Sequence, residues 1–458
     1  MKRFLWIATT SILLSLTGRA LADSSLEELL RGTAVTPALS GIQVSLLSAG
    51  EPSGSYAYGY ARYAERAGVT ESANVPLRID HKVRVASISK LFVAIGILRL
   101  VEDGKIDLDA DVSDYLGWEL RNPAYPELSI TARQLLSHTS SIRDEPGYFI
   151  AAGTGELRDF FDPDSSYWND GSHYAPAPGQ APGHYFAYSN LNFGLLGELI
   201  ERRSGERFDV YMKEAVLEPL GVSAHFNPCE IRDAERAAAY RKRNPDDDWN
   251  PKGPWFVQVD GADPTCFYGA GSAQEQREFL TSYPLGSNAS IFSPQGGLRA
   301  SADDLIRVLR TLFNHGMLDG QRILESESIE MLLDAEWTIN DARDNGNTSG
   351  EAEPGGPTDG LMESYGLSVH RIDMRSWGFD EGPALLVGHL GEAYGVLSHA
   401  LYDPLTGNGI ATIITGTADD PAASPPGHSP LYRVEEEVLR WWLSTLVDES
   451  SAAGQENP

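Results

Sequence analysis

The chain has 458 residues, of which 41% are hydrophobic and 22% are charged, so it can bury a large core and is not a disordered protein. Its 65 acidic residues outnumber its 36 basic ones, and the formal net charge of −29 disfavours nucleic acid or an anionic membrane surface as a partner. The two cysteines form no Cys-x-x-Cys pair, which excludes zinc-ribbon and iron–sulfur sites.

The first 22 residues have the pattern of a secretory signal peptide. Lys2 and Arg3 precede an apolar run, and residues 20–22 (Ala-Leu-Ala) form a small-x-small cleavage pattern. We predict cleavage after Ala22 and a periplasmic or secreted protein, with an uncleaved membrane anchor as the alternative. Cleavage removes three basic and no acidic residues, which changes the formal charge to −32. No membrane span is expected in the rest of the chain.

The first part of the mature chain predicts a helix, a hairpin and a second, buried helix. Leucines recur on one side of residues 24–32, and alternating patterns at 41–48 and 54–61 predict two paired strands. An extended segment at 78–86 follows. Residues 87–103 then predict a helix that is apolar almost all round, which is typical of a helix in the centre of a large domain.

The remaining chain is mainly helical and then returns to strands. The helical part contains long Pro/Gly/Asp-rich loops at 143–183 and 241–295, and residues 345–360 have the composition of a flexible loop. Predicted strands follow at 365–373, 384–389, 394–403 and 408–416, then a helix at 431–447.

This order predicts one α+β domain over residues 23–447. Both chain ends supply strands to an antiparallel sheet packed with helices, and an all-helical lobe of roughly 110–340 is inserted between them. A cleft is expected where sheet and lobe meet. Residues 448–458 are expected to be a loose polar tail.

Cys229 and Cys266 are candidates for a disulfide, because an exported protein folds in an oxidising compartment. The alternative is two unpaired buried thiols, and the sequence contains no geometry that decides between them.

Ser87 and Lys90 are candidates for a nucleophile and its base. They open the most apolar predicted helix, three residues apart and therefore on one face. A buried lysine loses its proton more easily and can then accept the serine proton. Only Lys90 among the seven lysines has serine three positions before it, and an idle lysine is unfavourable in such a helix.

Two further motifs carry groups that acyl transfer uses. Tyr188-Ser-Asn190 offers a phenol that can relay a proton and an amide that can orient a lysine or a substrate. His389-Leu-Gly391 lies in a strand pattern, where glycine permits close approach of a ligand. Taken alone, the Tyr188 motif is also explained by an ordinary helix start, and the His389 motif by a half-exposed histidine in a strand.

The order Ser-x-x-Lys, Tyr-x-Asn, His-x-Gly resembles the serine β-lactamase and penicillin-binding protein family, in particular its class C β-lactamase, DD-peptidase and esterase branch. Further stretches are similar to the same branch, at residues 104–109, 130–140, 293–298 and 301–305. The resemblance covers about residues 25–447 and implies a β-lactamase/transpeptidase-like fold with the active site between sheet and lobe.

The resemblance implies a role for each motif residue. Ser87 becomes acylated, Lys90 activates it, and Tyr188 is the general base or acid. Asn190 contacts substrate and Lys90, while His389 takes a cationic position in the third motif. The implied oxyanion hole consists of the backbone N–H groups of Ser87 and of Glu392, which follows Gly391. The mechanism needs no cofactor and no metal.

Leu390 and Glu392 depart from what β-lactamases and DD-peptidases use to bind a substrate carboxylate. Leu390 stands where the family usually has a hydroxyl residue, and Glu392 adds a negative side chain. Together with the net charge, this favours neutral or cationic acyl substrates. Ser141, where the family often has glycine, is a smaller departure.

The sequence therefore predicts an exported serine hydrolase that cleaves ester or amide/peptide bonds of a small molecule or peptide. A class C-type β-lactamase or DD-carboxypeptidase is the alternative within this fold. A penicillin-recognising sensor that acylates without turnover is a third possibility, which the presence of both Lys90 and Tyr188 disfavours. The oligomeric state is not predicted.

Overall fold

The computed structural model describes residues 24–64, 74–145, 147–176, 178–243, 248–262, 264–380 and 382–454. The predicted signal peptide lies outside these residues. In the described part of the chain, no helix is both long and apolar enough to cross a membrane.

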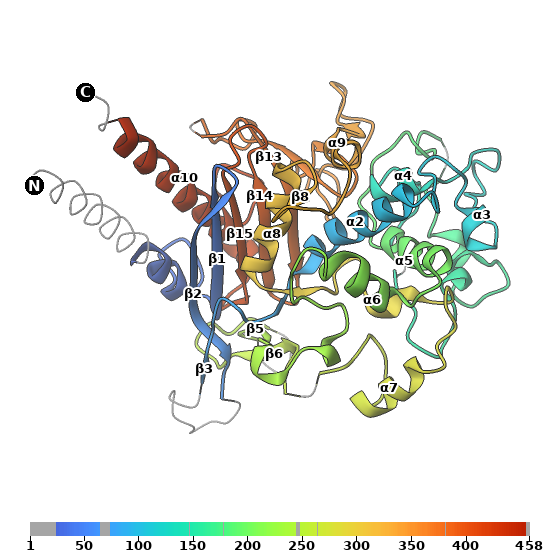
Figure 1. The fold of residues 1–458 in the computed structure, drawn as a ribbon, viewed down its shortest axis with the longest axis horizontal. Helices are drawn as coiled ribbons and strands as arrows, with labels where there is room; N and C mark the ends of the chain where they lie inside the picture. The colour runs from blue at the N-terminus through green and yellow to red at the C-terminus, as the bar shows by residue number, and fades with distance from the viewer. Residues whose placement is uncertain are drawn as a thin grey trace, which may run out of the picture.

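Among the described residues, an antiparallel sheet of nine strands combines both ends of the chain (Figure 1), as the sequence predicts. Its order is β10-β11-β12-β13-β14-β15-β1-β2-β3. β1 (Gly41–Ser48) and β2 (Glu51–Arg62) form the expected hairpin, and β1 also pairs with β15 (Gly409–Ile414). The other strands are β3 (Val75–Pro76), β10 (Trp337–Thr338), β11 (Ser364–Tyr365), β12 (His370–Asp373), β13 (Leu385–Ala393) and β14 (Val396–Tyr402).

Alternating side chains give the sheet two apolar faces. In β14, Val396 and Ala400 join the large core that also contains α8 (Ala302–Phe313), whereas Leu397 and Leu401 face α10 (Arg433–Gly454). The helix over residues 24–31 joins the second core through its leucines. The sheet therefore lies between two helical layers, one of them formed by helices from the chain ends.

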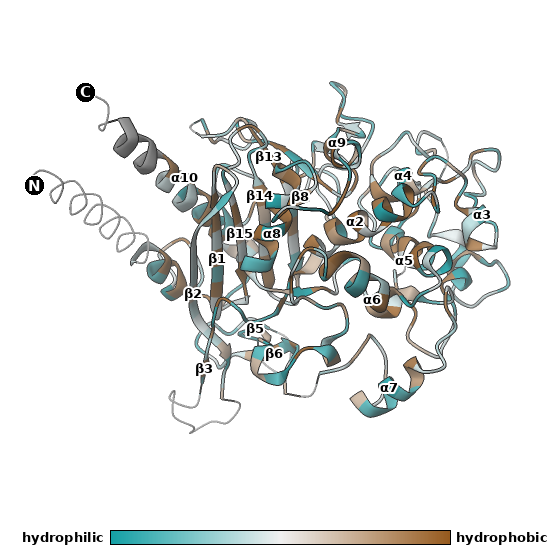
Figure 2. Ribbon diagram, viewed as in Figure 1, coloured by the Kyte–Doolittle hydropathy of each residue, from teal (hydrophilic) through white to brown (hydrophobic). Residues whose placement is uncertain are grey.

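The helical lobe lies beside the sheet, and α2 (Ser89–Glu102) runs between the two. A 3-10 turn at Ala86–Ile88 leads into α2, whose side chains are buried from its first residue through Leu98. Figure 2 shows how apolar α2 is. The other lobe helices are α3 (Ser113–Leu116), α4 (Ala132–Leu136), α5 (Leu191–Ser204), α6 (Phe208–Tyr211), α7 (Ala273–Leu280) and α9 (Ser326–Leu333).

Several predicted boundaries differ from the structure. The predicted lobe of 110–340 includes α8, but α8 packs on β1, β14 and β15 and so belongs with the sheet. The predicted loop at 241–295 contains α7 and β6 (Phe256–Val259). α10 continues to Gly454, so the expected polar tail from 448 begins inside a helix.

Short strands complete the fold around the sheet. β16 (Gly416–Thr417), β5 (Ala239–Arg241) and β6 form one small sheet, and β4 (Val83–Arg84) pairs with β7 (Arg299–Ala300). The predicted extended segment at 78–86 is thus a strand only at its end. β8 (Met317–Leu318) and β9 (Gln321–Arg322) form a hairpin after α8.

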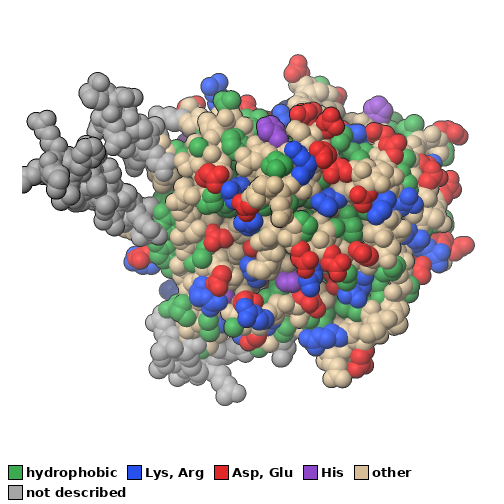
Figure 3. Space-filling model, in the orientation of Figure 1, with side chains coloured by type: hydrophobic (Ala, Val, Ile, Leu, Met, Phe, Trp, Pro, Cys, Tyr) green, Lys and Arg blue, Asp and Glu red, His purple; other side chains and the backbone are tan. Residues whose placement is uncertain are grey.

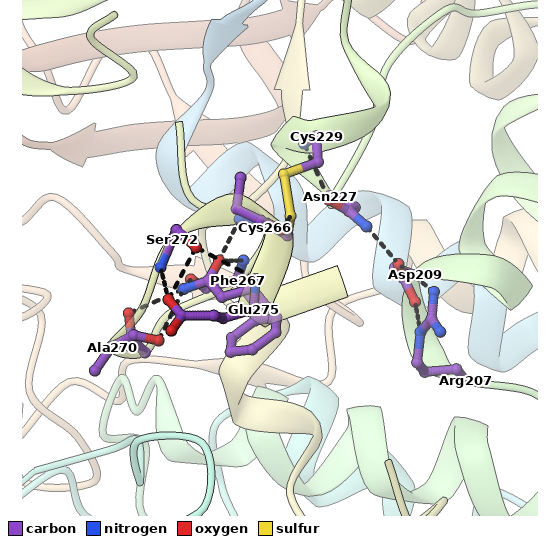
Figure 4. The surroundings of a disulfide bond; sticks show 12 residues. Arg207, Asp209, Asn227, Cys229, Cys266, Phe267, Ala270, Ser272 and Glu275 are labelled. Carbon is purple, nitrogen blue, oxygen red and sulfur yellow. Dashed lines mark hydrogen bonds and ion pairs between the residues drawn. A yellow bond between two sulfur atoms is a disulfide. The ribbon is translucent and has the colours of Figure 1, made fainter. Parts of the chain in front are cut away.

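Cys229 and Cys266 form a disulfide, as predicted, with a Cα–Cα distance of 4.9 Å (Figure 4). The backbone N–H of Cys229 donates to Asn227, whose amide donates in turn to Asp209 of α6. Cys266 stands shortly before α7. The bond therefore joins the segment that leads into α7 to a turn anchored on α6.

Candidate active site

Ser87 lies in the turn that begins the buried helix, and Lys90 lies directly behind it. Ala86 adopts a left-handed backbone with φ of 48° just before Ser87. The Lys90 side chain is fully buried, and its Nζ lies 2.9 Å from Ser87 Oγ. Nζ also donates to Asn190 Oδ1 at 2.9 Å and to the Gln295 carbonyl at 2.8 Å.

This environment favours a neutral Lys90 amine. Burial lowers the pKa of Lys90 to about 7, against smaller raising effects of the Glu351 and Asp144 carboxylates. A neutral amine has two N–H groups for the two carbonyl oxygens, and its lone pair is then free to accept the Ser87 O–H. The geometry therefore suits removal of the serine proton.

The aromatic ring of Tyr188 lies against the Lys90 amine. The ring centroid lies 4.7 Å from Lys90 Nζ, and Tyr188 lines the same chamber of the cleft as Ser87. Burial raises the pKa of Tyr188 well above its ordinary value, although the nearby Ser87 hydroxyl acts in the opposite direction. The resemblance allows Tyr188 to be a general base or a general acid, and the raised pKa keeps it protonated, which favours the role of proton donor.

Asp144 fixes the segment that carries Tyr188 and Asn190. Its carboxylate accepts the Ser189 hydroxyl at 2.7 Å, the backbone N–H groups of Asn190 and Leu191 at 2.8 and 2.9 Å, and the Asn190 amide at 3.0 Å. It thereby caps the N-terminus of α5 from a different segment. The sequence interpretation missed Asp144, although it stands four residues after the Ser-His-Thr-Ser motif that ends at Ser140.

Gly391 lets β13 approach the Ser87 backbone closely. A Cβ at this position would lie 2.6 Å from the Val85 carbonyl oxygen and 3.1 Å from Ser87 N. β12 pairs with β13 only up to Gly388, so the following edge of β13 faces the turn of Ser87. This arrangement suits the expected pair of oxyanion donors, the N–H groups of Ser87 and Glu392.

His389 lies behind the cleft wall, which differs from the expected cationic contact with substrate. It is buried, and its Nε2 is 2.9 Å from the Tyr365 hydroxyl. Burial and the neighbouring His370 hold the pKa of His389 well below its ordinary value, so the imidazole is neutral. Leu390, the next residue, lines the cleft instead.

Ser141 shows why the family often has glycine at its position. Its backbone φ is 67°, in the left-handed region that glycine adopts without strain.

The cleft consists of two chambers that meet at Ser87, Glu351, Glu392 and Ala393. The larger, about 400 Å³, we call the Tyr188 chamber; its walls include Tyr188, Arg241, Glu351, Leu361, Met362, Leu390, Glu392, Leu431 and Glu435. The smaller, about 330 Å³, we call the Arg84 chamber; its walls include Arg84, Tyr148, Phe149, Asn190, Tyr268, Gln295, Glu351, Glu392 and Tyr394.

Glu351 and Glu392 give the shared wall its negative charge. Glu351 comes from the predicted flexible loop at 345–360 and accepts a hydrogen bond from the Asn190 amide at 3.0 Å. Desolvation within the cleft raises the pKa of Glu392 to about 7. Neither Glu351 nor Arg84 was singled out from the sequence.

Comparison with known proteins agrees with this geometry, because a family model described as beta-lactamase matches residues 26–428. The chain belongs to the β-lactamase family. Esterase EstB of Burkholderia gladioli is 31% identical over 56% of the chain and 63% of its own length. The D-alanyl-D-alanine-carboxypeptidase/endopeptidase AmpH of Escherichia coli is 32% identical over 32% of the chain and 37% of its own length. Penicillin-binding protein 4* of Bacillus subtilis is 29% identical over 37% of the chain and 34% of its own length.

Solved structures share the β-lactamase-family fold along nearly the whole chain. The D-amino acid amidase from Ochrobactrum anthropi has a TM-score of 0.59 at 21% identity, with 95% of this chain and 99% of that chain covered. The octameric penicillin-binding protein homologue from Pyrococcus abyssi has a TM-score of 0.56 at 21% identity, with 89% of this chain and 74% of that chain covered. The fold is thus shared at an identity too low to transfer a substrate.

Proposed function

We propose that this member of the β-lactamase family is an exported serine hydrolase that forms an acyl-enzyme on Ser87 and cleaves ester or amide bonds. The observation that carries the proposal is the buried Lys90, whose amine lies 2.9 Å from Ser87 Oγ and is oriented by two carbonyl oxygens. The names of the relatives, an esterase, a carboxypeptidase/endopeptidase and an amidase, support acyl transfer as the reaction class.

Each chemical step has a group in place. The neutral Lys90 amine takes the Ser87 proton while Oγ attacks the substrate carbonyl. The N–H groups of Ser87 and Glu392 stabilise the oxyanion, and such a donor is commonly worth ~3–4 kcal/mol of barrier. Tyr188 gives its proton to the leaving group and regains one from Lys90. Water then attacks the ester, and its proton passes back along the same groups.

The Tyr188 chamber favours a neutral or cationic leaving group. Tyr188 lines this chamber and does not line the other, so the group that it protonates departs on this side. The chamber wall has three acidic residues, Glu351, Glu392 and Glu435, and one basic residue, Arg241. Leu390 offers no hydrogen bond to a carboxylate there.

The proposal is tested by replacing the nucleophile. We expect Ser87→Ala to lower kcat/KM for p-nitrophenyl esters by roughly 10³-fold or more, because no other group can form the acyl-enzyme. The control is Ser376→Ala, which removes an exposed serine outside the cleft and should leave kcat/KM unchanged. Full activity of Ser87→Ala would overturn the proposal.

The same preparations separate the alternatives. A chromogenic cephalosporin and D-amino-acid peptides are assayed beside the esters, with intact mass recorded after each incubation. Ester turnover without cephalosporin turnover supports the hydrolase. Fast cephalosporin or D-alanyl peptide turnover would instead support the β-lactamase or carboxypeptidase, and a stable penicillin adduct without any turnover would support the sensor.

A further inference from the structure

Arg84, three residues before Ser87, is a buried cation for which the described part of the chain supplies no hydrogen-bond acceptor. Its side chain lies at the end of β4 and the residue is only 8% exposed. Its Nε is shielded from solvent, and no group in the described part of the chain accepts a hydrogen bond from it. The guanidinium instead lies 4.8 Å from the centroid of the Tyr394 ring.

The Asp260 carboxylate, which affects the titration of Arg84, is already hydrogen-bonded to another arginine. Asp260 accepts two hydrogen bonds from Arg299, both at 2.9 Å, and Arg299 lies close enough to Arg84 to affect its titration. Of the two guanidinium groups, only that of Arg299 hydrogen-bonds to Asp260. Burial and Arg299 lower the pKa of Arg84 to about 10, so it keeps its charge at neutral pH. A buried charge without a partner is unfavourable, and an anionic ligand would supply the partner.

The Arg84 chamber is built to receive such a ligand beside the nucleophile. Four aromatic residues line the chamber together with Arg84: Tyr148, Phe149, Tyr268 and Tyr394. Burial raises the pKa of Tyr148 to about 12, so its phenol is protonated and can donate a hydrogen bond. Ser87 and Asn190 complete the chamber on the catalytic side.

The position of Tyr188 assigns this chamber to one half of the substrate. If the leaving group departs through the Tyr188 chamber, the acyl group that stays on Ser87 occupies the Arg84 chamber. We propose that the Arg84 chamber is an anion subsite that binds a carboxylate on the acyl half of the substrate. The guanidinium donates two parallel N–H···O bonds to that carboxylate, the arrangement that its planar geometry favours.

The inference rests on the proposed function for its assignment to the acyl half, and it narrows the substrate class. The net charge and Leu390 favour neutral or cationic acyl substrates in the sequence analysis. The structure restricts the part of that preference that comes from Leu390 and Glu435 to the Tyr188 chamber, because these two residues line only that chamber. Glu351 and Glu392 line both chambers, and Arg84 lines only the Arg84 chamber.

The test compares two esters that differ only in charge: the p-nitrophenyl half-ester of adipic acid and its terminal primary amide. We expect the intact protein to show at least a tenfold higher kcat/KM for the acid. Arg84→Gln should remove that preference, whereas Arg375→Gln, which removes an exposed arginine outside the cleft, should keep it. Equal rates for both esters, unaffected by Arg84→Gln, would overturn the subsite and leave the hydrolase standing.

A binding experiment makes the result independent of turnover. Calorimetry with Ser87→Ala measures the affinity for adipic acid monoanilide and for its terminal amide, with and without Arg84→Gln. We expect at least tenfold tighter binding of the acid, lost in the double variant. Arg84-dependent binding without ester hydrolysis would keep the anion subsite and refute the proposed function. Equal binding of both anilides would refute the subsite.

Discussion

Lys90 must be neutral to accept the Ser87 proton, so its burial sets the pH range of the reaction. With a pKa of about 7, the amine is protonated below that pH and neutral above it. We predict that kcat/KM for a neutral ester rises with pH from 5 to 8 with a midpoint near pH 7. Steady-state rates in constant-ionic-strength buffers give this profile.

Glu392 is the competing explanation for such a midpoint, because its pKa is also raised to about 7. The profile is therefore repeated with Glu392→Gln, which cannot titrate. A midpoint that stays near pH 7 in this variant belongs to Lys90. A profile that becomes flat would assign the midpoint to Glu392 and contradict the prediction.

For single residues, the sequence predicted those contacts that follow from spacing along the chain. Ser87 and Lys90 lie three positions apart at a helix start, so their contact follows from helix geometry. Asp144 and Arg84 could not be found in this way, because their importance depends on which distant groups lie beside them. His389 shows the converse: its motif was recognisable, but the burial that keeps it neutral arises from β11 and β12.

The N-terminus of α5 is the element whose position the chemistry depends on most. Asp144 holds it through four hydrogen bonds, and hydrogen bonds to a charged group contribute about 1.5–3 kcal/mol. We predict that Asp144→Ala lowers the free energy of unfolding by ~2–3 kcal/mol and kcat by at least tenfold. Urea unfolding and ester kinetics measure the two effects.

Asp164→Ala is the matched control, since Asp164 is an exposed residue in the same loop region. It should change neither quantity. Loss of stability in Asp144→Ala with an unchanged kcat would show that Asp144 only stabilises the fold and does not position Tyr188 and Asn190.

The sequence predicted the elements that have a strong hydrophobic pattern. It did not predict the position of elements, such as α8, whose place in the fold depends on packing. The alternation in β1, β2, β14 and β15 and the apolar surface of α2 identify them without tertiary information. α8 is an ordinary amphipathic helix, and its sequence does not say whether it covers the sheet or the lobe. α7 did have a readable signal, the capping box of Ser272 and Glu275.

For the whole molecule, a large net negative charge coexists with a buried cation, Arg84, in one chamber of the cleft. The face drawn in Figure 3 has acidic and basic side chains interspersed. Net charge is a sum, and it cannot show that Arg84 lies in one chamber without a hydrogen-bond acceptor among the described residues, while Leu390 and Glu435 line the other chamber. This is why composition excluded anionic partners in general but could not describe the two halves of the cleft separately.

Salt concentration distinguishes two effects on an anionic substrate: long-range repulsion by the net charge, which salt screens, and the short-range contact with Arg84, which it screens much less. At ~10 mM salt the screening length is about 30 Å, so an anionic substrate experiences repulsion from the net charge of −29. At ~100 mM it is about 10 Å, which removes most of this repulsion but leaves the contact with Arg84 largely intact. We predict that kcat/KM for the adipate half-ester rises several-fold over this range, while that for its neutral amide stays constant. A fall for the half-ester over the same range would mean that the cleft attracts anions at long range, and that the net charge does not govern their approach.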